Sequence, residues 1–227
     1  MAEQLTFDLP AKPALGREDF FVSDANAVAV ATLEGWADWP QRKMALAGEA
    51  GAGKTHLAHV WATAANAQVI NANSLSELDV AAVAAGSVVI EDADRIAGDN
   101  VLEKQLFHLH NLLLAQGHSL LLTGRVAPAQ WPIALPDLKS RLQGTAVAAL
   151  APPDDALLSA VMLKLFADRQ LQISPNLLPF LLRRIDRSFA AARATVQALD
   201  RAALAQGRPV TRILAAGVLD NRGEGGA

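Results

Sequence analysis

Residues 48–55 read Gly48-Glu49-Ala50-Gly51-Ala52-Gly53-Lys54-Thr55 and fill the pattern G-x-x-x-x-G-K-[ST] at every fixed position. In this pattern the glycines let the backbone turn back on itself, so that successive N–H groups point at phosphate oxygens. The lysine adds a positive charge for the terminal phosphates, and the hydroxyl of the last residue can ligate Mg²⁺. An apolar stretch at 43–47 precedes the pattern, and helical periodicity at 56–65 follows it. The sequence therefore predicts a loop that binds a nucleoside di- or triphosphate.

Composition sets the broad class. The chain has 227 residues, of which 52% are hydrophobic and 19% are charged, enough for one large domain or a domain with a small appendage. The opening Met-Ala-Glu-Gln-Leu lacks the basic and apolar segments of a signal peptide, and the absence of cysteine excludes disulfides and thiolate metal sites. We therefore expect a cytoplasmic protein. The net charge of −3 argues against strong, unaided binding to nucleic acid.

Short apolar segments alternate with helical patterns over the first two thirds of the chain. The segments that we expect to be strands are 43–47, 68–71, 87–91, 119–123 and 145–150. Strands alternating with helices indicate an α/β fold, with a five-stranded parallel sheet covered on both faces. The ligand is then expected at the carboxyl ends of the strands.

The remaining segments differ in composition. After Ala151-Pro-Pro-Asp-Asp155 the pattern is helical to about residue 219, with breaks at Ser174-Pro175 and Gly207-Arg-Pro209. This predicts an α/β domain at 19–151 and a small all-α domain at 152–219. Residues 1–18 are expected to form a flexible arm, and the polar, glycine-rich residues 220–227 a disordered tail.

A second candidate site element is Val88-Val-Ile-Glu91-Asp92, an apolar strand that ends in two acids. Such a strand brings carboxylates to the edge of the sheet, where Mg²⁺ and an attacking water would lie. One carboxylate can hold the metal together with Thr55, and the other can orient or deprotonate the nucleophile. The alternative interpretation is a strand that is followed by an ordinary acidic turn.

Together these features resemble the DnaA-related branch of the AAA+ ATPases, over nearly all of residues 19–219. The segments that carry the resemblance are residues 48–56, Glu91-Asp92, Glu103-x-x-Leu-Phe-His108-x-x-Asn111, Leu122-Thr-Gly124 and Leu135-Pro-Asp-Leu-Lys-Ser-Arg141-Leu. The resemblance implies an AAA+ P-loop NTPase core followed by a helical lid, with His56 beside the bound nucleotide. It also implies that Arg141 is an arginine finger, which would reach the γ-phosphate of a neighbouring molecule and make hydrolysis depend on assembly.

The resemblance extends to function and partners. It is strongest to regulatory members of the branch, which stimulate hydrolysis of DnaA-bound ATP, and we expect no helix-turn-helix DNA-binding domain after the lid. The stretch Gln4-Leu5-Thr6-Phe7-Asp8-Leu9 is similar to the peptide with which such proteins bind the sliding clamp, the beta subunit of DNA polymerase III. Leu5 with Phe7 or Leu9 would be the apolar anchors, and Gln4 would fix the register. The implied partners are DnaA and the clamp, with DNA contacted through the clamp; a homodimer is left open.

Three departures from the branch concern the protein's own nucleotide site. Glu91 stands where an Asp is usual, and Arg125 follows Thr123-Gly where an acid is common. The lid arginine aligns with Ala190, although Arg193 lies about one turn further along. We therefore expect the site to hold ADP or ATP with Mg²⁺ while hydrolysing it weakly. The alternatives are an autonomous AAA+ ATPase of the helicase-loader kind, and a replisome adaptor in which the nucleotide is purely structural.

Two other groups of residues are interpreted without a role in chemistry. No basic cluster surrounds the tryptophans, which favours packing over base stacking for Trp36, Trp39, Trp61 and Trp131. Arg183-Arg184-Ile-Asp-Arg187 is interpreted as a solvated helix face, with contact to DNA or a partner as the alternative.

Overall fold

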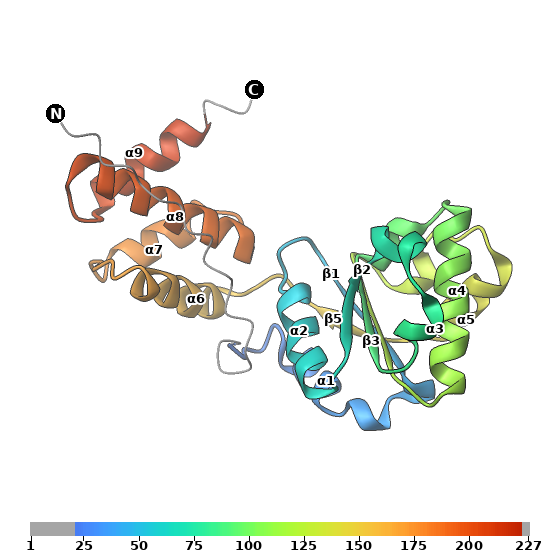
Figure 1. Cartoon of the computed structure of the whole chain (residues 1–227). Coiled ribbons are helices and arrows are strands. Elements are labelled where there is room, and N and C mark those ends of the chain that lie inside the picture. The colour runs from blue at the N-terminus through green and yellow to red at the C-terminus, as the bar shows by residue number, and fades with distance from the viewer. Residues whose placement is uncertain (1–20, 224–227) are drawn as a thin grey trace.

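A five-stranded parallel sheet forms the centre of the first part of the chain (Figure 1). The computed structural model describes residues 21–223. The strands are β1 (Lys43–Gly48), β2 (Gln68–Asn71), β3 (Val88–Glu91), β4 (Leu120–Gly124) and β5 (Ala146–Leu150). They lie in the order β2-β3-β4-β1-β5, and each pairing is parallel. The predicted fold class is confirmed, and the strand order places β1 between β4 and β5.

Helices cover both faces of this sheet (Figure 1). They are α1 (Ala27–Glu34), α2 (Lys54–Ala64), α3 (Val80–Val83), α4 (Asn100–Ala115) and α5 (Pro136–Gln143). Five short 3-10 helices occupy connections, at Trp36–Asp38, Pro40–Arg42, Ala72–Glu77, Ala93–Ile96 and Pro128–Gln130. Helices α1 and α2 lie on one face, and α3, α4 and α5 lie on the other.

The apolar runs in the strands follow from this two-sided cover. Leu120 and Leu122 of β4 pack into the apolar cluster on the α4 side, whereas Leu121 between them packs into the cluster on the α1 and α2 side. Successive side chains of a strand point to opposite faces, so a strand that is covered twice must be apolar at every position. This is why the strands were visible in the sequence as continuous apolar segments.

The tryptophans take part in packing. The ring of Trp39 stacks on that of Trp61, with the ring centroids 5.1 Å apart and the planes 18° apart. Trp36 meets Trp61 edge-on at 6.3 Å. Trp131, on the opposite face of the sheet, is also buried. These contacts hold the segment between α1 and β1 against α2.

The helical part of the chain has a separate apolar cluster (Figure 1). Its helices are α6 (Asp155–Asp168), α7 (Leu177–Leu182), α8 (Phe189–Gln206) and α9 (Arg212–Gly223). Asp154 caps α6 by accepting a hydrogen bond from the N–H of Leu157 at 2.7 Å. Phe21 packs against this cluster, so the first described residue contacts the helical part rather than the sheet. No helix within residues 21–223 combines the length and the apolar character needed to cross a bilayer.

The structure differs from the predicted disordered tail at residues 220–223. Helix α9 continues through them to Gly223. Val218 and Leu219 pack against the apolar cluster, and the carboxylate of Asp220 lies 3.3 Å from the guanidinium of Arg184. Packing of the apolar face of α9 thus accounts for a helix that extends into residues whose composition alone suggested disorder. Residues 224–227 and the arm at 1–18 lie outside the described residues.

One buried histidine on α4 gives the fold a dependence on pH. His110 is 2% exposed; its Nδ1 lies 3.2 Å from Oδ1 of Asn111, and its Nε2 has no hydrogen-bond partner among the described residues. Burial lowers the pKa of His110 to about 4; the contact with Asn111 opposes this shift, and the charges of Lys43 and Arg141 add to it. The folded protein therefore holds His110 neutral over a pH range in which an unfolded chain would protonate it.

We predict that stability declines as the pH falls from about 6.5, the ordinary pKa of histidine, towards 4. Over this range the unfolded state binds a proton that the folded state does not, which removes up to about 3 kcal/mol of unfolding free energy. Urea denaturation as a function of pH measures this decline. His110→Gln should flatten it, whereas His108→Gln, at an exposed position of the same helix, should leave it unchanged. A wild-type slope in His110→Gln would contradict the assignment.

Candidate functional site

The loop between β1 and α2 has the backbone geometry of an anion cradle. Gly51 and Gly53 have positive φ angles of 79° and 97°, which L-residues with a side chain rarely adopt. Helix α2 then begins at Lys54, with its positive end at the loop. Gly48 has a different role from the one predicted: a Cβ there would lie 2.8 Å from the carbonyl oxygen of Leu150, so glycine is needed for the close approach of β5.

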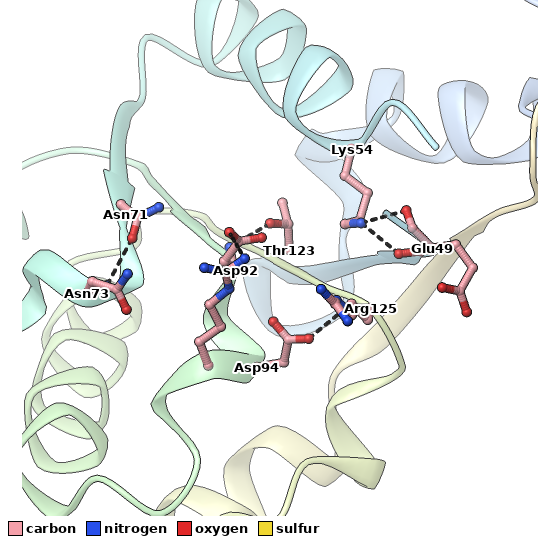
Figure 2. A network of polar contacts seen from close by, with 10 residues as sticks. Glu49, Lys54, Asn71, Asn73, Asp92, Asp94, Thr123 and Arg125 are labelled. Atoms are coloured by element: carbon pink, nitrogen blue, oxygen red, sulfur yellow. Dashed lines mark hydrogen bonds and ion pairs between the residues drawn. The ribbon is translucent and has the colours of Figure 1, made fainter. Parts of the chain in front are cut away.

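Lys54 closes over this loop. Its Nζ donates hydrogen bonds to the carbonyl oxygens of Gly48 at 2.6 Å and Glu49 at 3.0 Å, and the residue is 9% exposed (Figure 2). Burial lowers the pKa of Lys54 below its ordinary value. Three nearby carboxylates oppose this shift and one guanidinium adds to it; these groups belong to Asp92, Asp94, Glu49 and Arg125. The ammonium is therefore held at the centre of a group of charges at one edge of the sheet.

The remaining loop residues that were predicted to bind nucleotide occupy the surface around Lys54. Glu49, Ala50 and Thr55 are exposed, so the Thr55 hydroxyl is accessible to a metal ion. Ala52 is buried in the cluster beneath α2, and His56 is half-buried.

The two acids at the end of β3, Glu91 and Asp92, lie at the same edge of the sheet. Glu91 is half-buried, and its Oε1 is buried with no hydrogen-bond partner among the described residues. The backbone N–H of Asp92 donates to Oγ1 of Thr123 at 2.9 Å, which ties the end of β3 to β4 (Figure 2). The Asp92 carboxylate lies 3.4 Å from the guanidinium of Arg95. The unpartnered oxygen of Glu91 fits a ligand to a metal ion or to its bound water.

Within residues 21–223 no group of three or more His, Cys, Asp or Glu side chains is arranged to hold a metal by itself. A Mg²⁺ ion at a phosphate loop does not need such a group. It is bound by one or two protein oxygens together with phosphate oxygens and water. The Thr55 hydroxyl and the carboxylates of Glu91 and Asp92 are therefore sufficient as a donor set when a nucleotide is bound.

Arg125 was expected only as a departure from the branch at the nucleotide site, not as a nucleotide-binding residue. Gly124, the last residue of β4, is in register with Ala47 of β1, so Arg125, which follows it, stands beside the start of the phosphate-binding loop. The backbone N–H of Arg125 donates to Oδ2 of Asp94 at 2.9 Å (Figure 2). An arginine directly after an apolar strand was the available signal, but the sequence does not tell which strand is the neighbour of β1.

The first turn of α8 packs directly onto the phosphate-binding loop. The N–H of Phe189 donates to the carbonyl oxygen of Gly51 at 3.1 Å, and a Cβ on Gly53 would lie 2.9 Å from Cε2 of the Phe189 ring. Ala190 also lies at the loop, since its Cβ is 3.6 Å from the position of a Cβ on Gly51. Arg193 has an exposed side chain one turn further along. Its role in binding nucleotide stays a prediction.

Arg141 lies apart from all these residues. It is exposed near the end of α5, and its carbonyl oxygen accepts a hydrogen bond from Nζ of Lys43 at 2.7 Å. Lys43 is the first residue of β1, whereas the phosphate-binding loop begins at the other end of that strand. The structure therefore brings together the loop, Glu91 and Asp92, and leaves Arg141 at the opposite edge of the sheet. The predicted clamp-binding residues, Gln4, Leu5, Phe7 and Leu9, lie outside the described residues.

No protein-family model matches the sequence, but solved structures match the fold. Domain III of the replication initiation protein DnaA from Thermotoga maritima has a TM-score of 0.77 and 21% sequence identity, over 94% of this chain and 98% of that one. DnaA from Aquifex aeolicus with AMPPCP bound has a TM-score of 0.67 and 16% identity, over 82% of this chain and 65% of that one. The RuvB Holliday junction branch migration motor from Thermotoga maritima has a TM-score of 0.63 and 17% identity, over 86% of this chain and 65% of that one.

The chain has the AAA+ P-loop NTPase fold. It spans 65% of the length of the Aquifex DnaA chain and of the RuvB chain. Within this AAA+ fold, the phosphate-binding loop, the acidic end of β3 and the first turn of α8 meet at one edge of the sheet.

We predict that Gly53→Ala destabilises the protein by about 1–3 kcal/mol, because it combines a strained φ angle with a contact against the Phe189 ring. Thermal or urea unfolding measures the loss. Gly86→Ala is the matched control, since a Cβ there meets no atom within 4 Å. In a Phe189→Ala background the cost of Gly53→Ala should fall by about 0.5 kcal/mol or more. Full additivity would show that α8 does not press on the loop in solution.

Proposed function

We propose that this protein is a nucleotide-binding regulator of replication initiation, with a role like that of Hda, the regulatory inactivator of DnaA. Tethered to the DNA-loaded sliding clamp, it would stimulate hydrolysis of DnaA-bound ATP through an arginine finger, Arg141, that it supplies to its partner. The observation that carries the proposal is the position of Arg141, which is exposed and remote from the protein's own phosphate-binding loop.

The geometry of β1 supports action on another molecule. Lys43, which binds the Arg141 carbonyl, and Gly48, where the loop begins, are the first and last residues of this strand. A rise of about 3.3 Å per residue separates them by roughly 17 Å. A guanidinium must contact the transferring phosphoryl group to stabilise its charge. Arg141 is thus badly placed for the protein's own nucleotide and free to reach one that is bound to a neighbour.

The protein's own site is suited to hold ADP or ATP with Mg²⁺. Bound nucleotide would supply the phosphate charge that Lys54 and the loop are shaped to receive, and Mg²⁺ would neutralise part of that charge. Ala190 gives the lid no cation at the loop, whereas Arg125, directly after β4, places one beside it. A cation outside the lid would hold phosphate without requiring movement of the lid, which favours retention of the nucleotide over turnover.

A second candidate, an autonomous AAA+ ATPase, is favoured by one observation. The acids at the end of β3 and Thr55 of the loop are available to Mg²⁺, and Glu91 has a buried oxygen without a partner. This function requires substantial ATP turnover by the isolated protein, lost in Asp92→Asn. The regulator requires little turnover alone, so the basal rate separates the two.

The central prediction concerns Arg141→Ala. It should abolish the stimulation of DnaA-bound ATP hydrolysis, because removal of an arginine finger lowers the rate by about 10³-fold or more. Radiolabelled ATP preloaded on DnaA, with DNA-loaded clamp present, gives the measurement. Lys139→Ala, an exposed cation on the same helix, should retain stimulation, and both variants should bind nucleotide as wild type does. Equal stimulation by wild type and Arg141→Ala would remove the finger from the mechanism.

The tether gives a second prediction. Deletion of residues 1–10 should abolish binding to the clamp while leaving the fold intact, and Phe7→Ala alone should weaken binding by about tenfold or more through loss of an apolar anchor. Surface plasmon resonance on immobilised clamp measures both effects, with circular dichroism as the check on folding. Thr6→Ala, between two anchors, is the matched control. Undiminished clamp binding by the deletion variant would refute the tether.

A further inference from the structure

Helix α5 is held at its beginning by a buried carboxylate. Glu103 of α4 is 0% exposed, and it accepts hydrogen bonds from the N–H groups of Ala134 at 3.0 Å and Leu135 at 2.7 Å. It also accepts one from Gly98 at 2.8 Å. Burial raises the pKa of Glu103, but these backbone hydrogen bonds outweigh burial and leave the pKa below its ordinary value. A negative charge therefore lies at the residues that lead into α5.

The end of the same helix is held by a buried ammonium. Lys43 is 2% exposed, and its Nζ donates to the carbonyl oxygen of Arg141 at 2.7 Å. The hydroxyl of Thr145 approaches the same oxygen at 3.4 Å. Burial lowers the pKa of Lys43, and the charge of Arg141 adds to that shift. No other hydrogen bond of the Lys43 ammonium is observed among the described residues.

These two charges match the electrostatics of the helix between them. The beginning of a helix carries partial positive charge and its end partial negative charge. Helix α5 has eight residues. Its N-cap residue, Leu135, makes no side-chain hydrogen bond to the first turn. Burying a lysine and a glutamate is costly unless each is well hydrogen-bonded. Both a lysine and a glutamate are nevertheless buried at the ends of this one short helix.

The arrangement fixes the backbone of α5 while leaving Arg141 free to act. Leu138 and Leu142, one turn apart, bury one face of the helix, and Arg141 stands on the exposed face. The positive charge of Lys43 repels the guanidinium of Arg141. This repulsion disfavours a conformation in which the guanidinium folds back onto the sheet. His110 adds no competing charge at neutral pH, since its pKa is about 4. The helix thus presents a guanidinium from a rigid base.

We propose that Lys43 and Glu103 are positioning residues for Arg141. These two buried charges of opposite sign fix α5 at its ends and hold the guanidinium where it can contact the phosphates of a nucleotide bound by a partner. The inference rests on the proposed role of Arg141. A displacement of about 1 Å at a reacting group can cost roughly 100-fold in rate. Loss of either buried charge should therefore lower the rate of hydrolysis more than the affinity for the partner.

The first test measures partner ATP hydrolysis with DnaA and DNA-loaded clamp. Lys43→Met and Glu103→Gln should each lower the maximal stimulated rate by roughly 10- to 100-fold, with the concentration for half-maximal stimulation within about twofold of wild type. Lys43→Gln, which keeps a hydrogen-bond donor without the charge, should fall between wild type and Lys43→Met. The matched control is Lys139→Met, and nucleotide affinity should be unchanged in all variants. Equal maximal rates for wild type, Lys43→Met and Glu103→Gln would overturn the positioning role alone. No stimulation by wild type would overturn both the role of Arg141 as an arginine finger and the positioning role of Lys43 and Glu103.

A second test follows the helix itself and needs no partner. The chain contains no cysteine, so Ser140→Cys on α5 and Thr63→Cys on α2, both at exposed positions, can be spin-labelled selectively. Electron paramagnetic resonance should give a narrow distance distribution that broadens in Lys43→Met or, if that variant does not fold, in Lys43→Gln. Lys139→Met should leave the distribution narrow. An unchanged width in the folded Lys43 variant would show that the ammonium does not hold α5 and would overturn the proposal.

Discussion

Strand β1 is the constraint on which the rest of the structure depends. It pairs with β4 on one side and with β5 on the other, and its residues are buried except at the last position. Its carboxyl end turns into the phosphate-binding loop, and its amino end carries Lys43, which holds the end of α5. A strand in the middle of a sheet cannot bend without breaking both ladders. The two functional ends are therefore kept at a fixed separation.

That fixed separation divides the chemistry of the molecule. Phosphate-binding groups gather at one edge of the sheet, and the exposed guanidinium of Arg141 stands at the other. In the proposed function, a single subunit with this arrangement would hold one nucleotide and offer a catalytic cation to another. At Ala190 the lid has no arginine, and it meets the loop through the Phe189 backbone and ring.

Much of the site could be predicted because its signals are local. Gly51 and Gly53 are required by the path of a single turn, and an apolar strand ends at Glu91 with Asp92 directly after it. A pattern of this kind is complete within a few residues. The end of α9 was not predicted, because its stability comes from packing against other helices and from the pair between Asp220 and Arg184, which lie 36 residues apart.

The residues that hold Arg141 could not be predicted, for a related reason. Lys43 is 98 residues from the carbonyl that it binds, and Glu103 is 32 residues from the N–H of Leu135. In the sequence each stands next to another charged residue, Arg42 beside Lys43 and Lys104 beside Glu103, and most such charges are solvated. Only the order of the strands shows that the start of β1 faces the end of α5. Gly48 is a similar case. A side chain at this position would clash with Leu150, and the sequence does not show that the strand of Leu150 is the neighbour of β1.

The two ends of β1 use charge in opposite ways. At the loop, Lys54 is surrounded by carboxylates and by Arg125, and its interactions with backbone carbonyls can be exchanged for phosphate oxygens when an anion arrives. At the far end, Lys43 is almost wholly buried against a carbonyl that belongs to a helix. A lysine that can change partners suits a binding site, whereas one with no access to solvent or ligand suits a fixed support. The two lysines, one on β1 and one at the start of α2, thus serve different uses, and this contrast favours positioning over catalysis as the role of Lys43.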